Sequence, residues 1–249
     1  MAASIALSRR MTKSFRLPCP RILETSAVST EHAVRELQRV GVGISMILPM
    51  ATARQMDGAR ILRTFDEWTA GWHKSAVAPP PGDNFDAAIE RLHCANFELW
   101  HQEDKARDIQ SGDAVIAAAK HAIDRINQRR NDQIERCDEF LLQELSAENL
   151  PSSQAELHSE TPGMMLDRLS IMSLKMYHTR EETDRIPSPP GHRERNLRRL
   201  AILEQQRSDL ASCLDRLWQR VLDGEMRFQV YRQLKMYNDP DLNPALYNK

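Results

Sequence analysis

Apolar residues recur at helical spacing along most of the chain, and this pattern predicts a protein built from helices. The period is clear over 57–75, where Ile61, Phe65, Trp68 and Trp72 fall on one face. No segment alternates convincingly, as a half-buried strand would. The sequence therefore predicts an all-α fold, a single bundle of about six helices, over the residues 57–75, 84–108, 113–145, 161–185, 193–222 and 224–237.

The second and third of these helices are long, and the short turn Ser111–Gly112–Asp113 joins them. We expect them to pack as an antiparallel pair at the centre of the bundle. Asp83 is the expected N-cap of the second helix. Pro162 opens the fourth helix at its first position, where a missing N–H leaves no hydrogen bond unmade.

Residues 1–55 show no sustained period and predict a weakly ordered N-terminal extension, whereas residues 56–249 form the helical domain. Basic and acidic residues number 34 and 35, so no net field draws the chain to nucleic acid. The longest apolar stretch, 40–50, is too short to span a bilayer. The four cysteines form no CxxC pair, which favours reduced thiols and a cytoplasmic protein.

A stripe of polar residues lines each of the two central helices, directly beside the apolar face. On the second helix this stripe holds His93, Asn96, Asp104, Arg107 and Asp108, together with the aromatic residues Phe97 and Trp100, for which packing in the core is the favoured interpretation over stacking on a ligand. On the third it holds Lys120, Asp124, Asn127, Asn131, Glu135 and Asp138. Asn and Asp compete for backbone hydrogen bonds inside a helix, so a ligand or a shared polar network must offset their cost. Both interpretations stay open.

Two further places set polar groups among apolar ones. On the fourth helix, Asp167 and His178 share a face, and Arg168 and Lys175 flank it. Near the C-terminus, Arg232, Lys235 and Asn238 crowd beside two tyrosines. These basic groups could neutralise a phosphate, or they could form ordinary surface ion pairs.

Four segments of the chain together resemble a bacterial domain of unknown function, DUF4254. They are LHCANFELWHQEDKARD (92–108), KHAIDRINQRRNDQIERCDEFL (120–141), SETPGMMLDRLSIMSLKMYH (159–178) and YRQLKMYNDPDLNPALY (231–247). The resemblance covers about residues 60–247 and departs from the family at His158, where an asparagine is usual. It implies a helical, soluble protein without an established activity. Members often lie near glycosyltransferase and lipopolysaccharide genes.

The first functional hypothesis is a site for a phosphorylated sugar or a nucleotide sugar; whether the protein is an enzyme stays open. Its candidate catalytic residues are His93, His101, Asp104 and Asp124, and Glu103, Asp104 and Asp124 could hold Mg²⁺. The candidate ligand-binding residues are Asn96, Trp100, Arg107, Lys120, Asn127, Asn131, Asp167, Arg168, Lys175, His178, Lys235 and Asn238.

The second hypothesis is a non-catalytic accessory or scaffold protein for glycosyltransferases, in which the polar stripe is a structural hydrogen-bond network. A third, a di-metal carboxylate bundle, needs Glu-x-x-His pairs on facing helices. Glu98 and His101 have that spacing, but the third and fourth helices offer no such pair.

Overall fold

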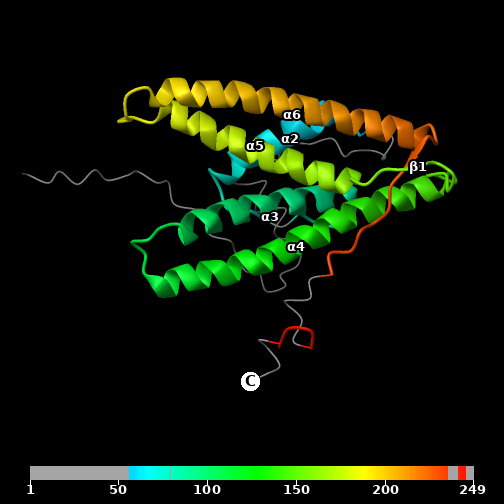
Figure 1. Ribbon diagram of the computed structural model, residues 1–249, viewed down its shortest axis with the longest axis horizontal. Helices are drawn as coiled ribbons and strands as arrows, with labels where there is room; N and C mark the ends of the chain where they lie inside the picture. The colour runs from blue at the N-terminus through cyan, green and yellow to red at the C-terminus, as the bar shows by residue number, and fades with distance from the viewer. Residues whose placement is uncertain (1–55, 79, 235–240, 245–249) are drawn as a thin grey trace, which may run out of the picture.

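The computed structural model describes residues 56–78, 80–234 and 241–244, and this part of the chain is mostly helical (Figure 1). The predicted extension 1–55 and the candidates Lys235 and Asn238 lie outside the described residues. The helices are α2 (Gly58–Trp72), α3 (Phe85–Ala106), α4 (Asp113–Ser146), α5 (Pro162–Asp184) and α6 (His192–Leu222). Two short strands, β1 (Glu156–Leu157) and β2 (Met226–Arg227), pair in parallel.

The helices lie in two groups that share one core. α3 and α4 lie side by side, as do α5 and α6, and α2 packs against α5 and α6 (Figure 1). Phe65, Leu92, Leu141, Leu166 and Leu214, one from each helix, are fully buried in the main core cluster. None of the described helices has the length and apolar character that a membrane span requires.

Local hydrogen bonds explain where the helices begin. Asn84 caps α3, because its Oδ1 accepts from the backbone N–H of Ala87 over 2.9 Å. The prediction of Asp83 as the cap is wrong, since its carboxylate faces Arg136 on α4 instead. Thr161 caps α5, and Pro162 occupies the first turn as predicted.

The prediction of a sixth helix over 224–237 is wrong for residues 224–234, the part of this segment that the structure describes. Residues 226–227 form β2, and the chain continues without helix to residue 234. Met226 and Phe228 are buried while Arg227 between them is half-exposed, which is the period of a strand. The segment also gains backbone partners far away in sequence: the His158 N–H donates to the Arg227 carbonyl over 2.8 Å. This pairing outweighs a weak helical pattern.

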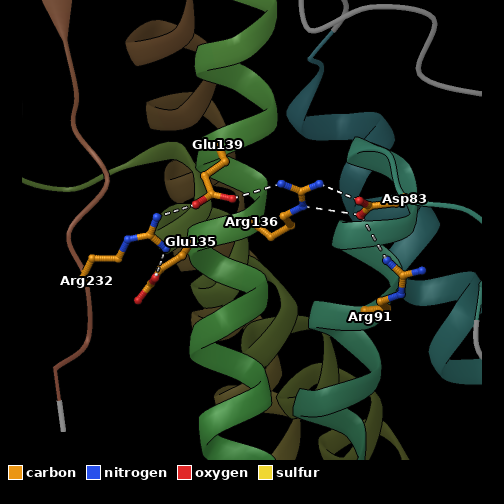
Figure 2. A network of polar contacts seen from close by, with 6 residues as sticks. All are labelled: Asp83, Arg91, Glu135, Arg136, Glu139 and Arg232. Carbon is orange, nitrogen blue, oxygen red and sulfur yellow. Dashed lines mark hydrogen bonds and ion pairs between the residues drawn. The ribbon is translucent and has the colours of Figure 1, made fainter.

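An ion-pair network fastens both the chain before α3 and the segment after β2 to α4 (Figure 2). Arg136 on α4 bonds to Asp83 over 2.6 Å and to Glu139 over 3.1 Å. Arg232 bonds to Glu139 and to Glu135, each over 2.7 Å. The basic group predicted here as a possible phosphate ligand, Arg232, is therefore paired with two carboxylates of α4.

The α4–α5 crossing is close because the first turn of α5 contains a glycine, Gly163. A Cβ at Gly163 would lie 2.5 Å from the carbonyl oxygen of Ile134 and 2.9 Å from Asp138 Oδ1. The same approach lets the Gly163 N–H donate to Asp138 Oδ1 over 2.7 Å. Asp138, at the end of the predicted stripe on α4, is thus a buried acceptor for the first turn of α5.

Candidate functional site

Three helices face one another with residues that recur in steps of four, and these steps create three successive layers. Residues four apart lie on the same face of a helix, so each step moves one turn along the contact. The residues are Thr69 on α2 and His73 at its C-cap, His93, Phe97 and His101 on α3, and Ser170, Leu174 and His178 on α5. The layers are a polar network, an apolar layer and a histidine cluster.

The polar network contains two buried residues of the predicted stripe, His93 and Asn96. Arg130 on α4 donates through Nε to Asp167 Oδ1 on α5 over 2.7 Å, and its other branch contacts Oδ2. Asn96 donates through Nδ2 to Asp167 Oδ1 over 2.9 Å and to Ser170 Oγ over 3.0 Å. Asp167 and Asn96 are both buried. The network therefore joins three helices by direct side-chain bonds.

His93 ends this network and is bonded at both ring nitrogens. Nε2 lies 2.9 Å from Thr69 Oγ1, and Nδ1 lies 2.8 Å from Ser170 Oγ. Because the Thr69 hydroxyl donates to the Phe65 carbonyl, it accepts from Nε2–H, and Ser170 donates to Nδ1. Burial lowers the pKa of His93 to about 3, so the ring is neutral near pH 7. Among the described groups of this network, the Asn96 Oδ1 atom is left without a partner.

An apolar layer separates the network from the histidine cluster. It contains Trp72, Val77, Phe97 and Leu174, all buried. The Trp72 ring contacts His93 at 5.2 Å between centroids, and the Phe97 ring contacts His101 at 4.6 Å. Phe97, which sequence analysis placed in the polar stripe, is thus part of the core.

The histidine cluster contains His73, His101 and His178, one from each of the facing helices. One ring nitrogen from each lies within 4.8 Å of the other two. In all three rings Nε2 is buried and has no hydrogen-bond partner. Burial lowers the pKa of His101 and of His178 to about 4, so both are neutral near pH 7. Neutral imidazoles at this separation form a set that could hold a metal ion.

Aromatic neighbours fix the orientation of these rings. Trp100 stacks on His178, with centroids 4.7 Å apart and planes 9° apart. Tyr177 stacks on His73 at 4.3 Å and 18°. Phe97 meets His101 edge-on at 74°. Each histidine therefore has a ring contact that limits its rotation.

A groove of about 430 Å³ lies beside the cluster, on the outer side of His178. Its walls come from α3, α5 and α6. They are lined by Trp100, Lys175, His178, Thr179, Glu182, Asn196, Arg199, Ile202 and Leu203. Three candidate residues from the sequence, Trp100, Lys175 and His178, therefore meet in one groove, joined by Arg199 from α6.

Two other hollows contain none of the candidate residues. One, of about 210 Å³, lies between α2 and α3 and is lined by apolar residues such as Phe65 and Trp68 and by Glu90. Burial raises the pKa of Glu90 to about 7. The other, of about 400 Å³, lies between α2, α5 and α6 around Arg207, which is bonded to Asp66 over 2.6 Å.

The remaining candidates lie apart from the groove. Asp104, Lys120 and Asp124 are exposed, and Asn127 and Asn131 are half-buried on α4. Glu103 and Arg107 pair with each other on α3 over 2.6 Å, and exposed Arg168 pairs with Glu160 over 2.6 Å. The group that comes within metal-ligating distance in the described chain is made of histidines, not of the acids Glu103, Asp104 and Asp124.

Sequence analysis missed His73, Arg130 and Arg199. Arg130 had a detectable signal, because it lies three residues after Asn127 on the same face of α4. His73 and Arg199 had none, since the other residues of the cluster and of the groove that they meet lie on other helices. His73 meets Tyr177, 104 positions away in the chain, only because α2 and α5 pack together.

Comparison with known proteins identifies the family but no activity. No curated protein and no solved structure matches the chain. Residues 86–230, more than half of the chain, match the model of a family described as a protein of unknown function, DUF4254. The match spans α3, α4, α5, α6 and the short sheet, and it confirms the resemblance seen in the sequence. The chain belongs to the DUF4254 family.

Proposed function

We propose that the groove beside Trp100 binds a phosphorylated sugar, as a free sugar phosphate or as part of a nucleotide sugar. The observation that carries this proposal is the meeting of Lys175 and Arg199 in a groove with an aromatic wall. Its volume of about 430 Å³ falls in the usual range for small-molecule sites, about 300–1,000 Å³.

The lining suits a ligand that has an anionic group at one end and, at the other, a ring with both hydroxyl groups and an apolar face. Lys175 is exposed and forms no ion pair with any described residue, so its ammonium is available to a phosphate. Arg199 is held at the groove by a bond from NH1 to Asn196 Oδ1 over 3.1 Å. Trp100, Ile202 and Leu203 supply apolar surface for a sugar ring, and Glu182 supplies an acceptor for hydroxyl groups.

Titration calorimetry with hexose phosphates, nucleotide sugars and inorganic phosphate tests this proposal. We expect Lys175→Ala and Arg199→Ala each to weaken binding of a sugar phosphate about tenfold or more, since a lost charge-assisted contact is worth roughly 1.4 kcal/mol or more. Arg168→Ala is the matched control, because it removes an exposed cation from α5, the helix that carries Lys175, at a position outside the groove. The proposal fails if the wild type binds none of these compounds, or if the control weakens binding equally.

A second candidate function, an accessory or scaffold protein for glycosyltransferases, is favoured by the polar network. Two buried residues of the stripe, Asn96 and His93, belong to a chain of hydrogen bonds that runs from Arg130 through Asp167, Asn96 and Ser170 to His93. Side chains that bond to one another in this way need no ligand to offset their burial, which supports a structural role for this part of the stripe. Under this candidate the protein acts through a surface, and it should co-purify with an enzyme of surface-polysaccharide synthesis.

A structural role for the network predicts a specific stability pattern. Arg130→Met leaves the buried Asp167 carboxylate without its cation and should cost about 3 kcal/mol. Adding Asp167→Leu to Arg130→Met removes the unpaired carboxylate and should recover about half of the stability that Arg130→Met loses. Urea unfolding of the two single variants and the double variant measures the coupling. Additive losses would contradict a direct structural pair.

A further inference from the structure

We propose that His73, His101 and His178 form a binding site for Zn²⁺ or another late first-row divalent cation. Each imidazole supplies Nε2, and a fourth coordination position is left for water or for an oxygen of a bound ligand. This inference does not depend on the sugar proposal, because it concerns the ring nitrogens of the three histidines and has its own readout; His178 is the residue that the cluster and the groove share.

The convergence of three unpartnered nitrogens is the first argument. Nε2 of every ring is buried without a hydrogen bond, and a nitrogen of each ring lies within 4.8 Å of the others. Buried polar atoms of folded proteins are almost always bonded, so three orphans at one place require an explanation. A tetrahedral ion with bonds of about 2.0–2.1 Å needs nitrogens about 3.3 Å apart. Small ring movements bring these three to that spacing.

Protonation of the rings gives the second argument. His73 Nδ1 lies 2.7 Å from the Thr69 carbonyl, and His178 Nδ1 lies 2.8 Å from a carboxylate oxygen of Glu181. Both partners are acceptors, so in the neutral form of each ring Nδ1 carries the proton and Nε2 keeps a lone pair. Two buried Nε2 lone pairs therefore lie in a cluster in which one nitrogen of each ring is within 4.8 Å of the other two. A cation bound between the rings would be attracted by both lone pairs and would offset the repulsion between them.

The same two bonds are the supporting contacts that metal-binding histidines use. Such a ligand donates its other N–H to a backbone carbonyl or a carboxylate, which fixes the tautomer and raises the basicity of the ligating nitrogen. Thr69 provides the carbonyl and Glu181 provides the carboxylate. The stacked Trp100 and Tyr177 rings hold His178 and His73 in place.

The donor set selects the class of metal. Imidazole nitrogen suits Zn²⁺, Co²⁺, Ni²⁺ and Cu²⁺, whereas Mg²⁺ and Ca²⁺ prefer oxygen. Three protein ligands, the number that the described residues supply, is also the number typical of zinc sites that keep an open position.

The first experiment uses the untagged full chain, stripped of metal by a chelator and titrated with ZnCl₂. We expect one Zn²⁺ per chain by elemental analysis and calorimetry, and CoCl₂ should give the visible absorption of a tetrahedral site. His101→Ala and His178→Ala should each weaken binding at least a hundredfold. His121→Ala is the control, because this exposed histidine lies on α4 away from the cluster.

A second measurement keeps the test independent of variant folding. X-ray absorption of the wild type loaded with Zn²⁺ should show nitrogen ligands at about 2.0–2.1 Å with the outer-shell scattering of imidazole. Absence of a stoichiometric site, an equal loss in His121→Ala, or a first shell without imidazole would each overturn the proposal. None of these outcomes bears on sugar binding, which is measured with protein from which a chelator has removed the metal.

Discussion

Two buried side chains tie the stability of the protein to pH in opposite senses. Desolvation lowers the pKa of His93 from 6.5 to about 3, so its contribution to stability is present above pH 6.5 and is lost as the pH falls. Desolvation raises the pKa of Asp138 from 3.8 to about 7, against the bonds from Thr161 and Gly163 that lower it. Its contribution is fully present below pH 3.8 and is lost as the pH rises through 7.

We predict that His93→Gln reduces the loss of stability between pH 7 and pH 5. In the wild type, folding must keep the buried ring neutral while the unfolded ring takes up a proton, which costs about 2 kcal/mol over this interval. Urea unfolding at the two pH values measures the difference. His121→Gln, at an exposed position, should retain the full wild-type loss. An unchanged loss in His93→Gln would show that the ring is not the titrating group.

At the scale of elements, local signals were sufficient for the helices and insufficient for the C-terminal segment. The predicted helices 84–108 and 161–185 correspond to α3 and α5 within two residues at each end, because caps and loop residues act locally. β2 depends on backbone bonds to residues 156–158, which no local pattern contains. The error over 224–237 therefore reflects a tertiary contact that outweighed the propensity of a short segment.

Two glycines in helices should respond oppositely to alanine. Gly163→Ala forces a methyl group against the Ile134 carbonyl at 2.5 Å, and we predict a loss of about 1–3 kcal/mol as α4 and α5 move apart. Gly71→Ala meets no atom within 4 Å and should gain about 0.5–1 kcal/mol from helix propensity. Thermal unfolding of both variants compares them directly. Equal effects would mean that the α4–α5 approach is not constrained by backbone contact.

At the scale of the whole molecule, the candidate site could be predicted only in part. Trp100, Lys175 and His178 were identified, because each lies in a recognisable polar pattern on its own helix. His101 was named for proton transfer, and its partner His73 was not named at all. The cluster depends on the packing of α2, α3 and α5 in a common register, which single-helix periodicity cannot supply. The acids expected to hold Mg²⁺ point instead to solvent or to Arg107.

The fastening of the C-terminal segment to α4 gives a prediction at the same scale. Arg232→Ala removes the bonds to Glu135 and Glu139 seen in Figure 2, and it should increase amide exchange over 229–234. The urea midpoint should not change, since exposed ion pairs add little to global stability. Hydrogen-exchange mass spectrometry compares it with Arg180→Ala, which removes the surface pair with Glu204 elsewhere. Unchanged exchange over 229–234 would assign the segment's order to other contacts.

The small parallel sheet has a consequence for the chain as a polymer. Arg227 bonds to the Ala155 carbonyl, 72 positions away, so β1 and β2 close a loop that contains all of α5 and α6. Closing a loop of this length costs chain entropy that a sheet with two residues per strand cannot offset alone. The pairing of β1 with β2 therefore depends on the packing of α5 and α6, which the loop contains. Conversely, the chain enters α5 directly after β1 and reaches β2 directly after α6, so the start of α5 and the end of α6 lie at the same small sheet. The β1–β2 pairing thereby joins the start of α5 and the end of α6, so that the two helices form one closed unit of the chain.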